Sequence, residues 1–242
     1  MKFLTMLKSL FICLCFLAAT SSLKAQDQEF RFGMKLSGNL SWMTPKSKNI
    51  ERTGNGVGYS YGIMGDYYFQ ENYALSTEIL ITQITGGMKY IDSLTYLGTS
   101  YSNVDYDFTY QYLQIPVSLK FKTKEIGYIT YWTQFGLAPS FLMGARADMS
   151  GDLPAEIAAD NPNDIRVNEK SNDKYHFDNF DDKVFFMRLP LIIGGGIEYS
   201  LAGNASLYAG FRVDNSFTNI FNADDFTGAR NNFVSISTGV FF

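Results

Sequence analysis

His176, the single histidine of the chain, lies beside acidic and hydroxyl side chains in a long polar stretch. Its neighbours Ser171, Asp173 and Asp178 make this the one place where hydroxyl, imidazole and carboxylate groups could meet. Such a set could serve a hydrolase or an acyltransferase, in which a base activates a nucleophile. No nucleophile motif stands nearby, and the sequence after residue 25 has no cysteine. We therefore predict a protein without enzymatic activity and without catalytic residues.

Three other motifs could hold a ligand. The segments Asp160–Asp164 and Asp178–Asp182 are rich in oxygen ligands, of which Ca²⁺ takes about six to eight, but neither has EF-hand spacing. A solvated acidic loop is the preferred interpretation. The run Gly194–Gly196 could suggest a phosphate-binding loop, yet such loops precede a helix and a strand pattern follows here. Glycines in a strand instead allow close packing of a neighbouring side chain. The prediction is no metal and no cofactor.

Charged side chains recur on the polar face of the predicted strands. Buried charges need partners, so their near-balance predicts a hydrogen-bonded plug of ion pairs, with a narrow pore as the alternative. Glu198 and Arg212 are expected at nearby heights, on strands joined by a short turn at Ala202–Gly203. The predicted interior charges are Arg31, Lys35, Lys120, Arg188 and Arg212, with Asp66, Glu78, Glu198 and Asp214.

Period-two alternation predicts the strands that position these charges. Between Tyr112 and Met143, for example, large apolar residues alternate with small or polar ones on two long segments. Both segments exceed the ~5–6 residues typical of soluble sheets and match the ~9–11 of membrane-crossing strands. We expect the apolar faces outside and the polar faces inside. The eight predicted strands are 30–42, 57–69, 73–86, 104–121, 129–143, 188–199, 207–217 and 234–242.

Long and short connections alternate strictly between these strands. This order predicts an all-β fold, an eight-stranded antiparallel up-and-down transmembrane β-barrel, with short turns and both termini in the periplasm. In the fourth strand the apolar residues change from even positions, ending at Tyr110, to odd positions from Leu113. The change predicts a β-bulge near Tyr112. Pro116 also requires a local irregularity.

Both ends of the chain are predicted to carry targeting signals. Lys2 and Lys8 precede a short apolar run, so residues 1–25 are predicted to be a secretory signal peptide, with residues 26–242 as the barrel domain. Removing three lysines changes the formal charge from −4 to −7, which argues against nucleic acid as a partner. Outer-membrane lipid is the expected surrounding. The last residue, Phe242, resembles the C-terminal aromatic signal for outer-membrane insertion.

Four segments together resemble a known family: FRFGMKLSGNLSW, YLQIPVSLKFKT, IIGGGIEYSLAGN and STGVFF. They resemble the PorT-like outer-membrane β-barrel family of Bacteroidetes, over nearly the whole chain after residue 25. The resemblance implies a non-catalytic barrel in the outer membrane of a Gram-negative bacterium. The name-giving member belongs to the type IX secretion machinery, which implies the alternative of an accessory component of a secretion or outer-membrane assembly complex.

The longest predicted loop, residues 147–183, has ten acidic and four basic residues. The strand order places it outside the cell. Aromatic residues dominate interface hot spots, so the cluster Tyr175, His176, Phe177 and Phe180 is the candidate contact for an envelope partner. A solvated acidic fringe is the alternative.

Overall fold

A computed structural model describes residues 30–46, 50–90, 94–96, 99–101, 104–150, 174–177, 184–201, 203–221 and 228–242. The predicted signal peptide lies outside these residues. No helix in the described part is long and apolar enough to cross a membrane. The strands are β1 (Phe30–Pro45), β2 (Ile50–Gln70), β3 (Tyr73–Tyr90), β4 (Leu94–Tyr96), β5 (Thr99–Tyr101), β6 (Val104–Gln114), β7 (Val117–Lys122), β8 (Ile129–Leu137), β9 (Ser140–Ser150), β10 (Lys174–Phe177), β11 (Met187–Arg188), β12 (Pro190–Ser200), β13 (Ser206–Ser216) and β14 (Ala229–Phe241).

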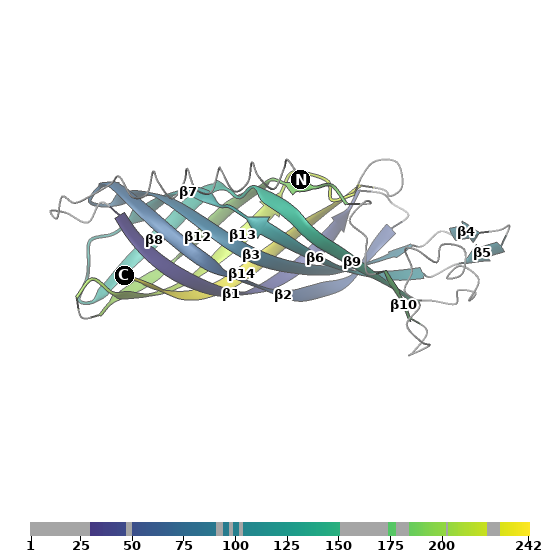
Figure 1. Ribbon diagram of the computed structural model, residues 1–242, viewed down its shortest axis with the longest axis horizontal. Helices are drawn as coiled ribbons and strands as arrows, with labels where there is room; N and C mark the ends of the chain where they lie inside the picture. Colours follow the sequence, from purple (N-terminus) through teal and green to yellow (C-terminus); the bar gives the residue numbers. More distant parts are fainter. Residues whose placement is uncertain are drawn as a thin grey trace, which may run out of the picture.

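Antiparallel pairing closes the larger sheet into a ring of eight (Figure 1), whereas β4 and β5 pair only with each other. Three of the eight are each interrupted once, so β6 and β7 form the fourth strand, β8 and β9 the fifth, and β11 and β12 the sixth. The seam between first and last strand is sealed by the ladder from Gly33–Phe241 to Pro45–Ala229. The predicted eight-stranded up-and-down barrel is therefore confirmed.

The side chains alternate as the periodicity predicts. In β1, Met34 is 62% exposed on the outside, whereas Lys35 is 4% exposed and points into the barrel. The same division holds around the ring, because successive strand residues face opposite sides. Large apolar residues form the outer surface, and polar or small residues form much of the lumen.

Strands extend further toward the long connections than the sequence predicts. β2 begins at Ile50 and β3 continues through Gly86–Gly87 to Tyr90, where loops were predicted. At the start of the longest predicted loop, residues 147–150 of β9 pair with β10. These ends of β6, β9 and β10 lie at one end of the barrel, and the hairpin of β4 and β5 lies beyond them (Figure 1). Pairing between neighbours, which periodicity does not report, sets these lengths.

The fourth strand corrects one interpretation of the sequence. Tyr106, Phe108, Tyr110 and Tyr112 are all buried inside the barrel, on the same face as Lys120. The strand therefore does not change face, because its apolar even positions line the lumen. The ladder is irregular near Tyr112 as predicted, but Met143 in the partner strand β9 is the extra residue. At Pro116 the strand breaks between β6 and β7, while the Pro116 carbonyl still accepts from the Glu78 amide.

Candidate functional site: the barrel lumen

The lumen near the short turns is organised around Glu198 of β12. Its carboxylate accepts from Arg31 Nη1 at 2.8 Å, from Lys120 Nζ at 2.7 Å and from Lys122 Nζ at 2.7 Å. Lys120 also donates to Asp66 Oδ2 at 2.6 Å. These side chains come from β1, β2, β7 and β12, so the cluster joins walls of the barrel that are not neighbours.

A second cluster lies around Glu78 of β3. Lys35 Nζ lies 3.0 Å from the Glu78 carboxylate oxygens, and Arg212 Nη1 donates to Oε2 at 2.9 Å. Gln114 links this cluster to the next, because its Oε1 accepts from Arg212 Nη2 at 3.2 Å while its Nε2 donates to Asp214 Oδ2 at 2.9 Å. One amide thus connects a cation with an anion.

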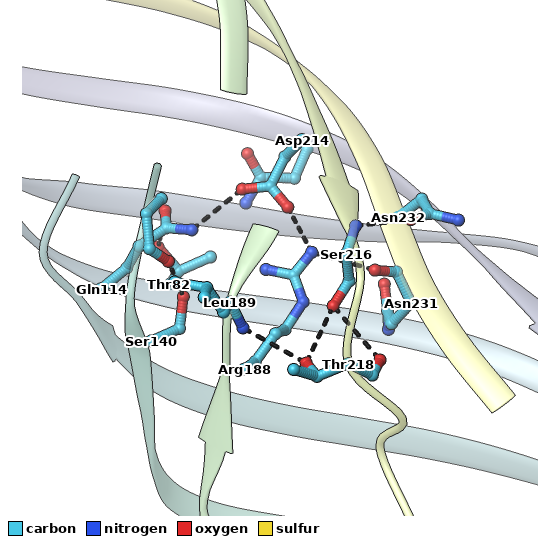
Figure 2. A network of polar contacts seen from close by, with 12 residues as sticks. Thr82, Gln114, Ser140, Arg188, Leu189, Asp214, Ser216, Thr218, Asn231 and Asn232 are labelled. Atoms are coloured by element: carbon cyan, nitrogen blue, oxygen red, sulfur yellow. Dashed lines mark hydrogen bonds and ion pairs between the residues drawn. The ribbon is translucent and has the colours of Figure 1, made fainter. Parts of the chain in front are cut away.

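The third cluster is seen in Figure 2, where Arg188 and Asp214 face each other as an ion pair. Arg188 Nη2 also donates to the backbone carbonyl of Asn231 at 2.9 Å. The two-residue strand β11 presents Arg188 to the lumen by pairing with Phe141 and Ser140 of β9. The Thr218 hydroxyl nearby accepts from the Leu189 amide and forms a hydrogen bond with the Ser216 hydroxyl. These bonds join the segment after β13 to the residue between β11 and β12.

All the charged residues predicted for the interior lie in the lumen, each in an ion pair with another of them. Lys122 follows the predicted strand 104–121, so the sequence assigned it to a short connection and its place in the lumen was missed. The predicted proximity of Glu198 and Arg212 gives no ion pair, because Glu198 is in register with Tyr208 and Arg212 with Gly194. Their partners come from across the lumen, which pairing along one hairpin does not reveal.

Aromatic rings fill the space beside the charges. Trp132 faces inward and stacks on Tyr208 with ring centroids 4.9 Å apart. Gly196 and Gly210 make room for the indole, since an added Cβ would lie 2.7 Å and 2.3 Å from it. Lys120 Nζ lies 4.6 Å from the centroid of the Phe241 ring, a cation–π arrangement. The close packing expected at the Gly194–Gly196 run is thus present at Gly196.

Toward the long connections the lumen is apolar. The rings of Tyr106 and Phe108 stack at 5.9 Å, and those of Phe108 and Tyr110 also stack at 5.9 Å. Phe221 packs against Phe108 with centroids 5.3 Å apart. The shared parity of these tyrosines with Lys120 was the signal in the sequence. The buried cluster also includes Met43, Ile50, Ile84, Met88, Tyr112, Ala145, Ala147, Val184, Ile220, Ala229 and Phe233.

For most of the remaining predicted site residues, the structure gives either the backbone pairing alone or no placement. Tyr175, His176 and Phe177 belong to β10, whose backbone pairs with β9, and His176 is in register with Asp148. Phe180 and the two oxygen-rich segments lie outside the described residues. Within the described ranges, no group of three His, Cys, Asp or Glu side chains could hold a metal ion. Phe242 is exposed at the end of β14 and donates its amide to the Phe32 carbonyl at 2.7 Å.

The barrel is similar to known proteins in sequence and in shape. Residues 24–226 match the family described as "Outer membrane protein beta-barrel domain". No curated protein sequence matches the chain.

Three solved structures illustrate the similarity in shape. Neisserial surface protein A (NspA) is 14% identical, with 87% of this chain and 95% of that chain covered and a TM-score of 0.42. OprG from Pseudomonas aeruginosa is 11% identical, with 88% and 94% covered and a TM-score of 0.42. The outer membrane protease OmpT from Escherichia coli is 9% identical, with 92% and 99% covered and a TM-score of 0.40.

Proposed function

Because the chain belongs to the outer membrane protein beta-barrel domain family, we propose that it is a non-enzymatic barrel that acts through its long-loop end. The barrel lies in the outer membrane of a Gram-negative bacterium, surrounded by lipid. Its interior holds the barrel together and does not transport solutes. The single observation that carries this proposal is the filled lumen.

Two layers support a closed lumen. Ion pairs across the barrel occupy the half near the short turns, and the aromatic cluster occupies the other half. An eight-stranded barrel is just wide enough to be filled by side chains, so the side chains alone are enough to block a continuous pore.

We expect negligible conductance from the purified barrel in planar lipid bilayers. Ions would have to break the pairs of Glu198 and Glu78 and then pass the rings of Phe108 and Tyr110. Single-channel recordings at high salt are the measurement, with a known porin as the positive control. Steady ohmic currents that persist after deletion of residues 150–182 would refute the plug.

The long-loop end offers the working surface. There β2, β3 and β6 surround a groove of about 680 Å³, with Gly56, Thr85, Gly87 and Asp107 among its lining residues. The β10 segment with Tyr175, His176 and Phe177, together with Phe180, is the proposed contact for an envelope protein. The acidic excess of residues 147–183 favours a basic partner surface, or one bound through a bridging cation.

The proposal places the short turns and both termini in the periplasm and the long connections outside the cell. Protease added to intact cells should therefore cut first within residues 150–182, giving two fragments on a denaturing gel. Deleting these residues should leave a folded barrel, because the ring closes without them. Protection in whole cells, with cleavage only after the outer membrane is broken, would reverse the orientation.

Membership of a type IX secretion or outer-membrane assembly complex is the second candidate. It rests on the resemblance of segments such as YLQIP, which covers the end of β6 and the break before β7. In β7, directly after this segment, Val117 and Leu119 face outward on a wall that a neighbouring membrane protein could cover. Purification from native outer membrane under mild detergent tests this: a large complex with secretion components supports it, and an isolated barrel contradicts it.

A further inference from the structure

The described part of the lumen carries more positive than negative charge. Six cations, Arg31, Lys35, Lys120, Lys122, Arg188 and Arg212, are paired with four anions, Asp66, Glu78, Glu198 and Asp214. The formal excess is two positive charges. Three cations share Glu198 and two share Glu78, so the excess lies in these two clusters and not at the Arg188–Asp214 pair. Buried charge without compensation is unfavourable.

Hydrogen-bond donors in the same region also lack acceptors. Among the described residues, Arg212 Nε, Gln134 Nε2 and Trp132 Nε1 have no hydrogen-bond partner, although all three side chains are buried. Buried donors normally find a partner in the protein or in ordered water. All three come from β8 and β13, which flank β12.

Strand register places one of these donors, Gln134, between two cations, Lys120 and Arg212. Lys120 is in register with Gln134, Gln134 with Gly194, and Gly194 with Arg212. One inward row therefore crosses β7, β8, β12 and β13, spanning roughly 15 Å at normal strand spacing. Gly194 places no side chain between Gln134 and Arg212. Trp132 lies two residues from Gln134 on the same strand face.

We infer that this row binds a small monovalent inorganic anion of the halide class, between Gln134 and Arg212. Water could satisfy the free donors but would leave the two excess charges uncompensated. An anion accepts hydrogen bonds from the donors and also reduces the excess positive charge. Rings of Arg and Lys attract anions in the same way in anion-selective pores. The anion site does not depend on which partner binds the long-loop end. A negative result for the anion site would therefore not contradict the proposed partner contact, and a negative result for the partner contact would not contradict the anion site.

Trp132 provides a direct reporter of the site. The chain has two tryptophans, so Trp42→Phe leaves Trp132 as the single emitter. Sodium bromide should replace sodium gluconate at constant ionic strength in a solution of the full-length protein in detergent. We expect saturable quenching of Trp132 emission by bromide, reversed by chloride. The temperature of unfolding should rise with bromide over the same range of concentration.

A charge placed in the row tests the assignment. Gln134→Glu supplies a negative charge where the anion would bind, so the half-saturating bromide concentration should increase at least tenfold. Gln111→Glu makes the same change on the exposed outer face of β6 and should leave the titration unchanged. Quenching that is linear in bromide and equal in both variants would overturn the proposal. If Gln134→Glu does not fold, the unaltered protein provides the test. Equal unfolding temperatures in bromide and in gluconate would then overturn the proposal.

Discussion

Arginine in place of Val117 should greatly reduce the fraction of protein that folds into lipid vesicles. Val117 begins β7, faces outward with 44% of its surface exposed, and pairs with Thr77 and Leu137. It lies five residues above Lys122 at the short turn, which places it near the middle of an apolar band about 25 Å tall. Arginine at that depth on the lipid face of a barrel costs about 2–4 kcal/mol. Urea titration of protein refolded in vesicles would measure the loss.

Two control variants separate the cause from a general effect of arginine. Asn72→Arg makes a comparable change in the short turn between β2 and β3, in water, and should alter the free energy of unfolding by less than about 0.5 kcal/mol. Ser118→Arg is the neighbouring position but faces the lumen, where Ser118 is 3% exposed. It should destabilise the barrel in thick and thin bilayers alike, because crowding inside does not depend on lipid.

The same experiment tests membrane insertion itself. A folded barrel migrates differently on unheated and boiled gels, and Val117→Arg should lose most of the folded band. A protein that stays soluble without detergent, and whose unheated and boiled mobilities agree, would contradict a lipid-facing Val117.

The alternation of side chains made the ring predictable, because each strand is long enough for its two faces to differ clearly in the sequence. Alternation separates two faces but does not state which face is inside. For Met34 and Lys35 the charge decides the matter, since an isolated lysine on the lipid face would be unfavourable. For Tyr106 to Tyr112 the nearest charge on the aromatic face is Lys120, beyond the break at Pro116, and these positions were assigned to the outside although they fill the lumen.

Contacts across the lumen were the part that the sequence did not provide. Hairpin neighbours can be counted along the chain, but Lys120 reaches Asp66 and Glu198 from different walls of the barrel. Those distances depend on the closure and stagger of the ring, which no single segment encodes. The inward position of Trp132 depends likewise on Gly196 and Gly210, on two other strands.

Replacing Glu198 by Gln should cause the largest loss of stability among changes inside the barrel. Glu198 is the shared partner of Arg31, Lys120 and Lys122, and its side chain is 3% exposed. The neutral amide keeps the size of the side chain but leaves the three cations with Asp66 as the single anion of the cluster. Removing one partner of a buried ion pair typically costs about 3–5 kcal/mol.

The free energy of unfolding in detergent, followed by the folded gel band in increasing urea, is the measurement. Glu125→Gln is the matched control, since Glu125 is exposed and accepts from the Ser200 hydroxyl at 2.9 Å; it should change stability by less than about 0.5 kcal/mol. Adding Lys122→Met to Glu198→Gln should recover part of the loss, because one uncompensated cation disappears and contacting residues are not additive. Equal stability of Glu198→Gln and Glu125→Gln would show that the cluster around Glu198 does not hold the barrel together.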